Sequence, residues 1–437
     1  MILALLFLLL LLGTGGAVDV QVGPQARPSG AVILVVDGLG ASYVYPEHHA
    51  YALDGSPLGQ AALFNLTGSG GRVVDVRVPV PETTKSHGVL ITGSSSVDPQ
   101  FLGPTIFDAA RKNGYLSIAL LERGDSIEVL KKQDAVLYLG DNALHGAEPI
   151  PGFRESAPQD LHELLGTWRD NFSEYTFAAG LPGYAGYDRW GLDAAAALVN
   201  HLGSRHFLML VNVGAVDSAG QNLGVDGYLK TVEALDAPLG KLAEACRRNG
   251  VLLVVTADHG MSFPAAKGKG GHSAAKYADR LESLRVPLVL SGPGVEEMNL
   301  GGQWSEVDIA PTVLDLLNIS QNISSEGRSL PLKDSYDLRV VGAPGGVTLW
   351  RGEEMLANAS EGGVDNFRGL VRGIYTIEAD GKSQEVLING DQTIDLNEKK
   401  APWADMKKAI GIILILAINL AGILLIIRII KKENNSS

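Results

Sequence analysis

Four places in the sequence put a carboxylate or an imidazole where it could bind a metal ion. Asp37, Asp217 and the adjacent pair Asp258 and His259 each come just after an apolar run that is typical of a buried strand. His272 ends a short glycine-rich segment, whose flexible backbone can bring the ring close to other groups. Open α/β sheets build their sites at the carboxyl ends of strands. Because carboxylate oxygen and imidazole nitrogen suit a divalent cation, these residues together predict a metal site.

Each of these features alone also fits a plainer structural role. Asp37 precedes a glycine and fits an ordinary turn, Asp258 and His259 fit a capping role, and His272 fits a surface loop. The prediction of a metal site therefore rests on the four features taken together and on the elements that must bring them to one place.

Apolar runs alternate with amphipathic stretches from Ala31 to about Leu330. The runs that predict strands are Ala31–Val36, Tyr115–Leu121, Ala135–Leu139, Phe207–Val213, Val251–Thr256 and Val286–Leu290. The stretches that predict helices are Pro104–Lys112, Leu161–Arg169, Leu192–Leu202, Gly227–Arg248 and Val307–Leu317. Buried strands that alternate with helices favour an α/β sandwich around a mostly parallel central sheet. We expect this domain to span residues 31–333.

The pattern changes over residues 334–398, which read as a small β-rich segment. Strands are predicted over Val347–Trp350, Gly373–Ile377 and Glu385–Leu387, and Ala379–Gly381 is typical of a hairpin turn.

Both ends of the chain carry apolar runs outside this pattern. The leucine-rich start predicts a signal peptide over residues 1–17, or a retained anchor because no Lys or Arg precedes the run. Residues 409–427 carry no charge and are long enough for a transmembrane helix, with a buried core helix as the alternative. Residues 428–437 would then form a cytoplasmic tail. These features predict a single-pass protein of the cell membrane with its catalytic domain outside.

Composition excludes several classes of protein. The formal net charge is −13, from 36 Lys and Arg against 49 Asp and Glu, which argues against a nucleic-acid-binding surface. Cys246 is the only cysteine, so an intramolecular disulfide and a cysteine-rich zinc module are excluded.

The order of the acidic and histidine residues along the chain resembles the alkaline phosphatase superfamily. The resemblance is strongest to its nucleotide pyrophosphatase/phosphodiesterase and cofactor-independent phosphoglycerate mutase branches. It extends from about Ala31 to Leu330, and Ser305–Leu314 is similar to the closing helix of that family. The resemblance implies an alkaline-phosphatase-like fold, a site for two divalent metal ions, commonly Zn or Mn, and phosphate-ester substrates.

The resemblance also implies a nucleophile in the segment Val80–Gly93. In the phosphodiesterase pattern the attacking threonine lies four residues before a histidine, here His87, which selects Thr83. Thr84 is the close alternative and Ser86 a more distant one. A threonine hydroxyl is a poor nucleophile at neutral pH and needs activation by a bound metal ion. A role for Thr83 as a helix N-cap is the structural alternative.

Carried over position by position, the resemblance assigns ligands to two metal ions. The ligands implied for the first are Asp37, Thr83, Asp258 and His259, and those for the second are Asp217 and His272. The family's remaining histidine is replaced by Gln221, whose amide offers only a carbonyl oxygen and suits Mn²⁺, Mg²⁺ or Ca²⁺ better than zinc. We therefore expect the second site to be weak, unless another histidine completes it; the candidates are His145, His162, His201 and His206.

The sequence thus predicts an exported, membrane-anchored, metal-dependent phosphohydrolase, either a phosphodiesterase or a phosphatase, that acts through a phosphothreonine intermediate. The alternatives are transfer of a phospho-group to a lipid or glycan, and a non-catalytic binding protein on a degenerate phosphatase fold. A formylglycine sulfatase is disfavoured because Cys246 lies far along the chain from the nucleophile segment. A phosphoglycerate mutase is disfavoured because its substrate is cytosolic. The expected partners are a phosphate-ester substrate and the membrane.

Overall fold

A computed structural model describes residues 17–67, 70–100, 102–121, 127–139, 148–320, 323–359 and 363–397. Contacts divide the chain into a larger unit, Pro24–Tyr336, and a smaller unit made of the segment up to Gly23 and the chain from Asp337 onward. The predicted transmembrane helix and tail, and all of the predicted signal peptide except its last residue, lie outside the described residues. Within the described ranges, no helix has the length and apolar character needed to cross a bilayer.

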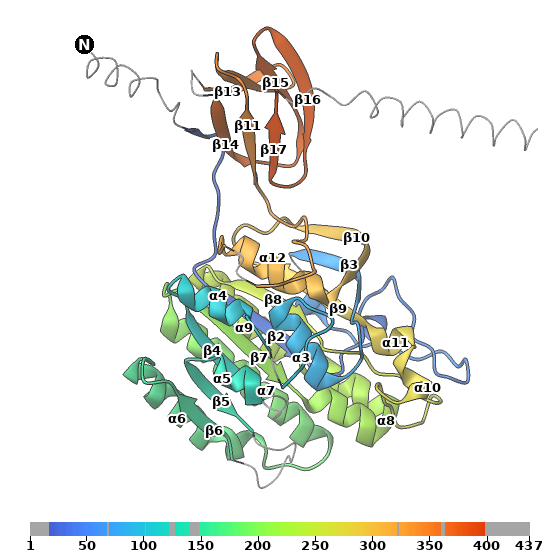
Figure 1. Cartoon of the computed structure of the whole chain (residues 1–437). Coiled ribbons are helices and arrows are strands. Elements are labelled where there is room, and N and C mark those ends of the chain that lie inside the picture. The colour runs from blue at the N-terminus through green and yellow to red at the C-terminus, as the bar shows by residue number, and fades with distance from the viewer. Residues whose placement is uncertain are drawn as a thin grey trace, which may run out of the picture. The chain divides into compact units, whose positions relative to one another are not determined.

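The larger unit is built on a mixed sheet. Its strands are β2 (Ala31–Val36), β3 (Gly71–Arg77), β4 (Leu116–Leu121), β5 (Ala135–Tyr138), β6 (Ile150–Phe153), β7 (Phe207–Val213), β8 (Leu252–Thr256), β9 (Arg285–Ser291) and β10 (Met298–Ser305). Over the described residues they form a nine-stranded sheet in the order β10-β3-β9-β8-β2-β7-β4-β5-β6 (Figure 1). The pairs β3–β9, β9–β8 and β5–β6 are antiparallel and the other pairs are parallel, which confirms a mostly parallel sheet.

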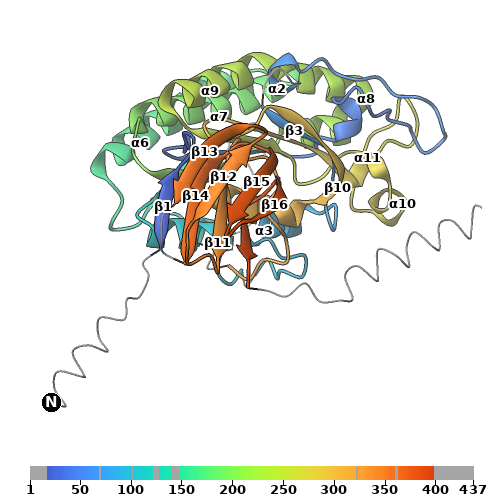
Figure 2. The same ribbon diagram turned by 90° about the horizontal axis from the view of Figure 1, so that it is seen from above.

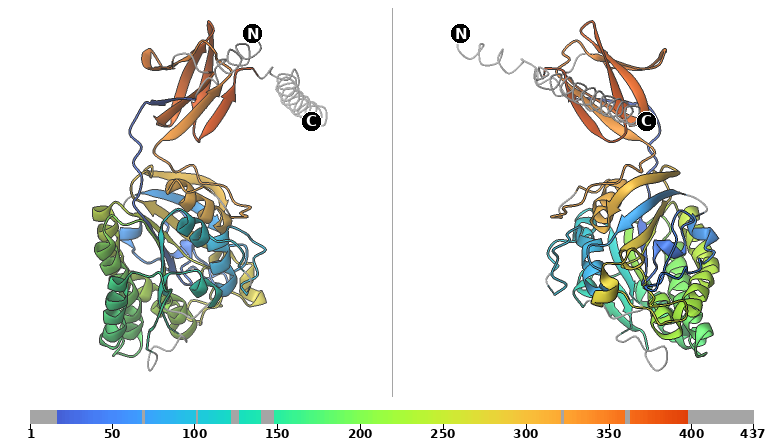
Figure 3. Two further views of the ribbon diagram at one scale, coloured as in Figure 1. Left: turned by 60° about the vertical axis from the view of Figure 1, so that its left-hand side comes forward. Right: turned by 90° about the vertical axis from the view of Figure 1, so that its right-hand side faces the viewer.

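Helices cover both faces of this sheet, which explains why its central strands are apolar on both sides. Every residue of β2, β7 and β8 is buried. The helices are α2 (Phe64–Thr67), α3 (Thr83–Thr92), α4 (Ile106–Lys112), α5 (Ile127–Lys131), α6 (Gln159–Tyr175), α7 (Leu181–Leu202), α8 (Ala215–Ala234), α9 (Asp236–Asn249), α10 (Ala275–Ala278), α11 (Leu281–Leu284) and α12 (Ile309–Leu316), with short 3₁₀ turns at Ala41–Tyr43 and Glu306–Asp308. Helices α6, α7 and α9 cover one face, and α3, α4 and α12 cover the other (Figure 3). Helices α7 and α9 lie side by side (Figure 2).

The smaller unit is β-rich. Its strands are β1 (Val18–Gln21), β11 (Tyr336–Val341), β12 (Val347–Arg351), β13 (Glu354–Ala359), β14 (Val364–Leu370), β15 (Gly373–Ala379), β16 (Lys382–Ile388) and β17 (Gln392–Asp395). Within the described residues they form two four-stranded sheets, β1-β14-β11-β17 and β13-β12-β15-β16. The predicted hairpin is present between β15 and β16, where Asp380 and Gly381 both have positive φ, 50° and 71°. Strand β1, which pairs in parallel with β14, has no counterpart among the sequence-based predictions.

Candidate active site

The candidate site lies at the carboxyl ends of three neighbouring parallel strands. Asp37 follows β2, Asp258 follows β8, and Asp217 lies in the first turn of α8, just after β7. The Asp37 backbone joins the end of β2 to the turn between β7 and α8. Its N–H donates to the Val213 carbonyl at 2.9 Å, and its carbonyl accepts from the Asp217 N–H at 3.1 Å. The sheet therefore brings the three predicted carboxylates to one edge.

Gly38 permits this close approach. Its φ is +79°, and a Cβ added there would lie 2.8 Å from the Asp217 Cβ. A side chain at this position would meet both the left-handed backbone and the neighbouring helix turn.

Asp37, Asp258 and His259 form the first of two clusters that could hold a metal ion, and all three are buried. The His259 Nε2 atom lies 3.4 Å from Asp37 Oδ1 and 3.4 Å from Asp258 Oδ2. His259 Nδ1 lies 2.9 Å from the Gly260 carbonyl. Because a carbonyl only accepts, Nδ1 carries the proton and Nε2 presents its lone pair to the carboxylates, which is the tautomer that binds a metal.

Asp258 carries the charge that such a cation requires. Its Oδ1 accepts from the backbone N–H groups of Gly38 and His259, at 3.1 and 2.9 Å. Its buried Oδ2 accepts no hydrogen bond. Burial raises the Asp258 pKa, but the neighbouring His259 and His87 and the hydrogen bond from the Gly38 N–H together outweigh burial and lower the pKa. Two buried carboxylates and an imidazole lone pair fit a divalent cation.

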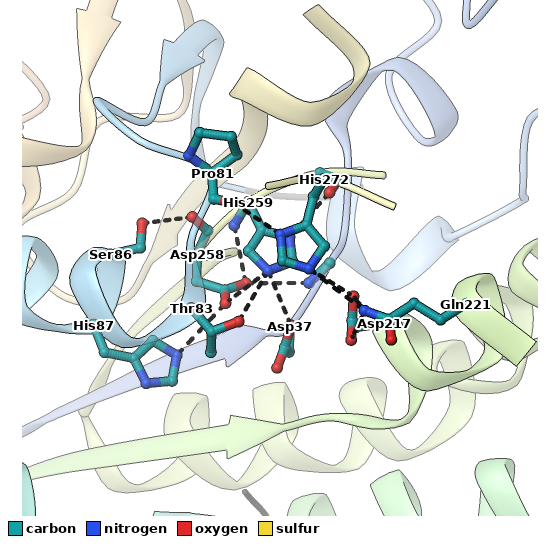
Figure 4. Close-up of polar contacts among 12 residues, drawn as sticks. Asp37, Pro81, Thr83, Ser86, His87, Asp217, Gln221, Asp258, His259 and His272 are labelled. Atoms are coloured by element: carbon teal, nitrogen blue, oxygen red, sulfur yellow. Dashed lines mark hydrogen bonds and ion pairs between the residues drawn. The ribbon is translucent and has the colours of Figure 1, made fainter. Parts of the chain in front are cut away.

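Thr83 is the first residue of α3 and joins this cluster. Its Oγ1 lies 3.0 Å from His259 Nε2, so the hydroxyl donates to the imidazole lone pair (Figure 4). Ser86 is engaged elsewhere: its Oγ lies 2.5 Å from the Asp258 carbonyl and 2.7 Å from Glu306 Oε1. Of the predicted nucleophiles, Thr83 is therefore the one that these contacts place against the metal-binding side chains. Among the described residues, no hydrogen bond joins the Thr84 hydroxyl to either metal-binding cluster.

Asp217, His259 and His272 form the second cluster. The Asp217 Oδ1 atom lies 3.6 Å from His272 Nε2. His272 Nδ1 lies 2.8 Å from the Pro81 carbonyl, so this nitrogen carries the proton and Nε2 presents a lone pair. The rings of His259 and His272 stack with centroids 3.6 Å apart (Figure 4). Burial and the neighbouring His259 lower the His272 pKa, which favours its neutral form.

The glycine-rich loop returns His272 to the sheet edge. Ser262 and Gly271 exchange two backbone hydrogen bonds of 2.9 Å each and close the loop between them. A Cβ on Gly270 would lie 2.5 Å from the Met261 Sδ, and one on Gly271 would lie 2.6 Å from the Tyr277 ring. The predicted role of these glycines, close approach of the histidine, thus has a steric basis.

Gln221 lies beside the second cluster. Its Nε2 atom is 3.0 Å and 2.9 Å from the two Asp217 carboxylate oxygens and 3.4 Å from His272 Nε2. The amide therefore presents its nitrogen to Asp217 rather than the oxygen that a cation would bind.

The other histidines considered for the second site are held elsewhere. His162 stacks on Phe153, His201 Nε2 is 2.9 Å from Asp160, and His206 Nδ1 is 2.8 Å from the Ser29 carbonyl. None of the three belongs to a metal-binding group among the described residues. His145 lies outside the described residues.

Two supporting residues were not predicted from the sequence. Glu306 is fully buried against Ser86, and burial raises its pKa well above the ordinary value. The Tyr228 hydroxyl donates to the Gly38 carbonyl at 2.9 Å and accepts from the Gly40 N–H at 3.0 Å. The Tyr228 hydroxyl braces the loop that carries Asp37, and Glu306 contacts Ser86 on α3, the helix that begins at Thr83. Tyr228 lies inside α8, and Glu306 follows β10, a strand without an apolar run that would mark it in the sequence.

A family model and several curated proteins match parts of this chain. Residues 190–321 match the family model of the metalloenzyme superfamily. A 2,3-bisphosphoglycerate-independent phosphoglycerate mutase of Gloeobacter violaceus is 30% identical over 144 residues, which cover 32% of this chain and 26% of the relative. The mutase of Caenorhabditis elegans is 31% identical over 129 residues, covering 29% and 23%. The chain thus spans only about a quarter of the length of the curated relatives it matches.

Among solved structures, the alkaline phosphatase PafA has a similar fold. The TM-score is 0.52 at 13% sequence identity, and the match covers 70% of this chain and 98% of that chain. This likeness shows an alkaline-phosphatase-like α/β fold.

Proposed function

We propose that this chain, a member of the alkaline phosphatase and metalloenzyme superfamily, is a metal-dependent enzyme that hydrolyses phosphate esters through Thr83. The observation that carries the proposal is the 3.0 Å contact between Thr83 Oγ1 and His259 Nε2, at the point where α3 begins. A hydroxyl nucleophile, three buried carboxylates and two neutral imidazoles meet there. Phosphate monoesters and diesters are both candidate substrates.

The chain's own groups suit phosphoryl transfer in two steps. Thr83 Oγ1 attacks phosphorus, the bond to the ester oxygen breaks, and the alcohol leaves with the hydroxyl proton. Water then attacks the phosphothreonine and restores the Thr83 hydroxyl, which releases phosphate when the substrate is a monoester and a phosphate monoester when it is a diester. The start of α3 supplies backbone N–H groups and the positive end of the helix dipole for the phosphoryl oxygens. Divalent cations held by Asp37, Asp258 and His259, and by Asp217 and His272, would lower the hydroxyl pKa and neutralise phosphoryl charge.

Transfer to an acceptor hydroxyl is the second candidate activity. Two of the similar curated proteins are named as phosphoglycerate mutases, which favours a phosphoryl group that leaves Thr83 for an alcohol rather than for water. The first step is the same in both cases, so product analysis separates them. A phosphorylated acceptor formed in the presence of added alcohol would support transfer, and free phosphate alone would support hydrolysis.

The proposal is tested with purified protein on a panel of aryl phosphate monoesters and diesters. We expect turnover that a chelator abolishes and that an added divalent cation restores. Thr83→Ala should lower kcat by several orders of magnitude, because loss of a covalent nucleophile disables the whole reaction. Thr84→Ala is the matched control and should retain turnover. No hydrolysis of any ester with metal present would favour a binding protein on this fold.

We also propose that the enzyme is exported and anchored in the cell membrane, with its catalytic domain outside. The support is in the sequence, in the leucine-rich start and the uncharged run over residues 409–427. Fractionation of cells that express the full chain should place it in the membrane pellet, and protease added outside the cells should digest it. Recovery of the full chain in the soluble fraction would contradict the anchor.

A further inference from the structure

Gln221 is set opposite the His272 loop by a break in α8. The helix carries a non-helical residue, Gly224, with φ 73° and ψ −164°, so the first turns of α8 form a short segment of their own. Asp217 and Gln221 are four residues apart and share one face of that segment. The Gly270 N–H donates to the Gly220 carbonyl at 2.9 Å, which fixes the His272 loop against the end of the segment.

A count of hydrogens shows what the Gln221 amide does there. The Asp217 carboxylate only accepts, and His272 Nε2 only accepts because the ring's proton is on Nδ1, against Pro81. The amide nitrogen of Gln221 has two hydrogens, and it lies within 3.0 Å of both Asp217 oxygens and 3.4 Å from His272 Nε2. One amide nitrogen thus bonds to the lone pairs that a cation would need from both ligands.

We propose that Gln221 is an internal competitor for the second metal ion, so that the two sites fill in order and with different affinities. This inference rests on the proposed function, in which Asp217 and His272 bind a cation. A cation entering there must first displace the amide nitrogen, whose hydrogens carry positive partial charge. The first cluster differs, because the backbone donors to Asp258 bond to Oδ1 and leave Oδ2 directed at His259. The hydroxyl that contacts His259 Nε2 there belongs to Thr83, which is itself an expected ligand of the first ion.

The competitor makes the second site respond to the concentration of free cation. A hydrogen bond between an amide and a charged group contributes a net free energy that corresponds to a change in affinity on the order of ten-fold or more. Cations with a preference for oxygen have a second advantage, because an amide turned about its last bond offers Oε1 as a ligand. We therefore expect Zn²⁺ to bind the first site tightly and the second site weakly. For Mn²⁺ the difference in affinity between the two sites should be smaller.

The test is a calorimetric titration of metal-stripped full chain with Zn²⁺, and separately with Mn²⁺. The wild type should bind the first ion tightly and the second at least ten-fold more weakly. Gln221→Ala should increase the affinity for the second ion on the order of ten-fold and leave the affinity for the first unchanged, because the competing amide is removed. Gln221→His should tighten the second step for Zn²⁺ further. Asn222→Ala is the matched control, since the side chain of this exposed neighbour donates to the Ser218 carbonyl and should change neither step.

Two results would overturn the inference. One is a second step that weakens in Gln221→Ala, which would make the amide a ligand rather than a competitor. The other is two equal tight steps in the wild type that neither variant changes. Thermal unfolding at rising metal concentration gives an independent readout, with a second rise in Tm that shifts to lower cation concentration in Gln221→Ala. Failure of the proposed function looks different: no variant would bind any metal ion, or every variant would bind two without hydrolysing a phosphate ester.

Discussion

Replacing Tyr228 by phenylalanine should loosen the loop that carries Asp37. The Tyr228 ring is buried in an aromatic cluster with Tyr43 and Phe263, at centroid distances of 4.9 and 5.5 Å. Burial raises its pKa, so the hydroxyl keeps its proton and donates to the Gly38 carbonyl while it accepts from Gly40. Because Tyr228 lies in the part of α8 that follows Gly224, it ties the Asp37 loop to that part of the helix.

The size of the effect follows from the two hydrogen bonds. Phenylalanine keeps the ring packing but leaves the Gly38 carbonyl and the Gly40 N–H buried without this partner. Each such group costs about 1–3 kcal/mol, so Tyr228→Phe should lower the free energy of unfolding by roughly 2–6 kcal/mol. Tyr43→Phe is the matched control from the same cluster. Its hydroxyl donates to the Met261 carbonyl at 2.7 Å, so its loss should cost about half as much, about 1–3 kcal/mol.

Two measurements check this prediction. Urea unfolding of the metal-stripped proteins gives the stability difference, and the rate of metal loss to a chelator reports on the ligand loops. Tyr228→Phe should lose metal faster than both the wild type and Tyr43→Phe. If Tyr228→Phe is as stable as the wild type and holds metal equally long, the hydroxyl does not brace the Asp37 loop and the reasoning is refuted.

Three further outcomes are expected. Glu306→Gln should gain stability relative to the wild type as pH rises above about 4.5, because the raised Glu306 pKa makes the folded wild type keep a proton that its unfolded chain loses. The gain is roughly 1.4 kcal/mol per unit by which the pKa is raised, and unfolding curves at several pH values measure it. A stability difference that does not change with pH would contradict this prediction. Gly38→Ala should destabilise the fold by at least about 1–2 kcal/mol and weaken metal binding, since its Cβ would lie 2.8 Å from the Asp217 Cβ, and unchanged calorimetric binding would count against this. A fragment of residues 18–398 should be soluble and folded without detergent, as judged by circular dichroism and size-exclusion chromatography, and its retention in the membrane fraction would be the opposite result.

The central strands could be predicted from the sequence because they are buried on both faces. Such strands are continuous apolar runs, and β2 and β7 have the predicted ends. Strand β3 alternates buried with more exposed residues, whereas β10 has no buried residue and contains adjacent glycines, so neither strand gives an apolar run. Strand β1 is four residues long, and its partner β14 lies at the far end of the chain, a pairing that local pattern cannot reveal.

The candidate ligands were predictable for a similar reason. Asp37, Asp217 and Asp258 follow three strands that the sequence marks clearly, and neighbouring parallel strands end at one edge. The braces were not predictable, because Glu306 and Ser86 meet across 220 residues of chain. The departure at Gln221 was visible in the sequence, but the amide's orientation depends on hydrogen bonds to Asp217 and His272 that only the folded chain forms.

The most direct test of the account is to trap the covalent intermediate. Metal-loaded protein is mixed with an activated aryl phosphate ester, quenched in acid within one turnover, digested and analysed by mass spectrometry. We expect a phosphoryl group on Thr83, absent from Thr83→Ala and present in Thr84→Ala. Phosphate on Thr84 or Ser86 instead, or rapid hydrolysis that persists in Thr83→Ala, would contradict it.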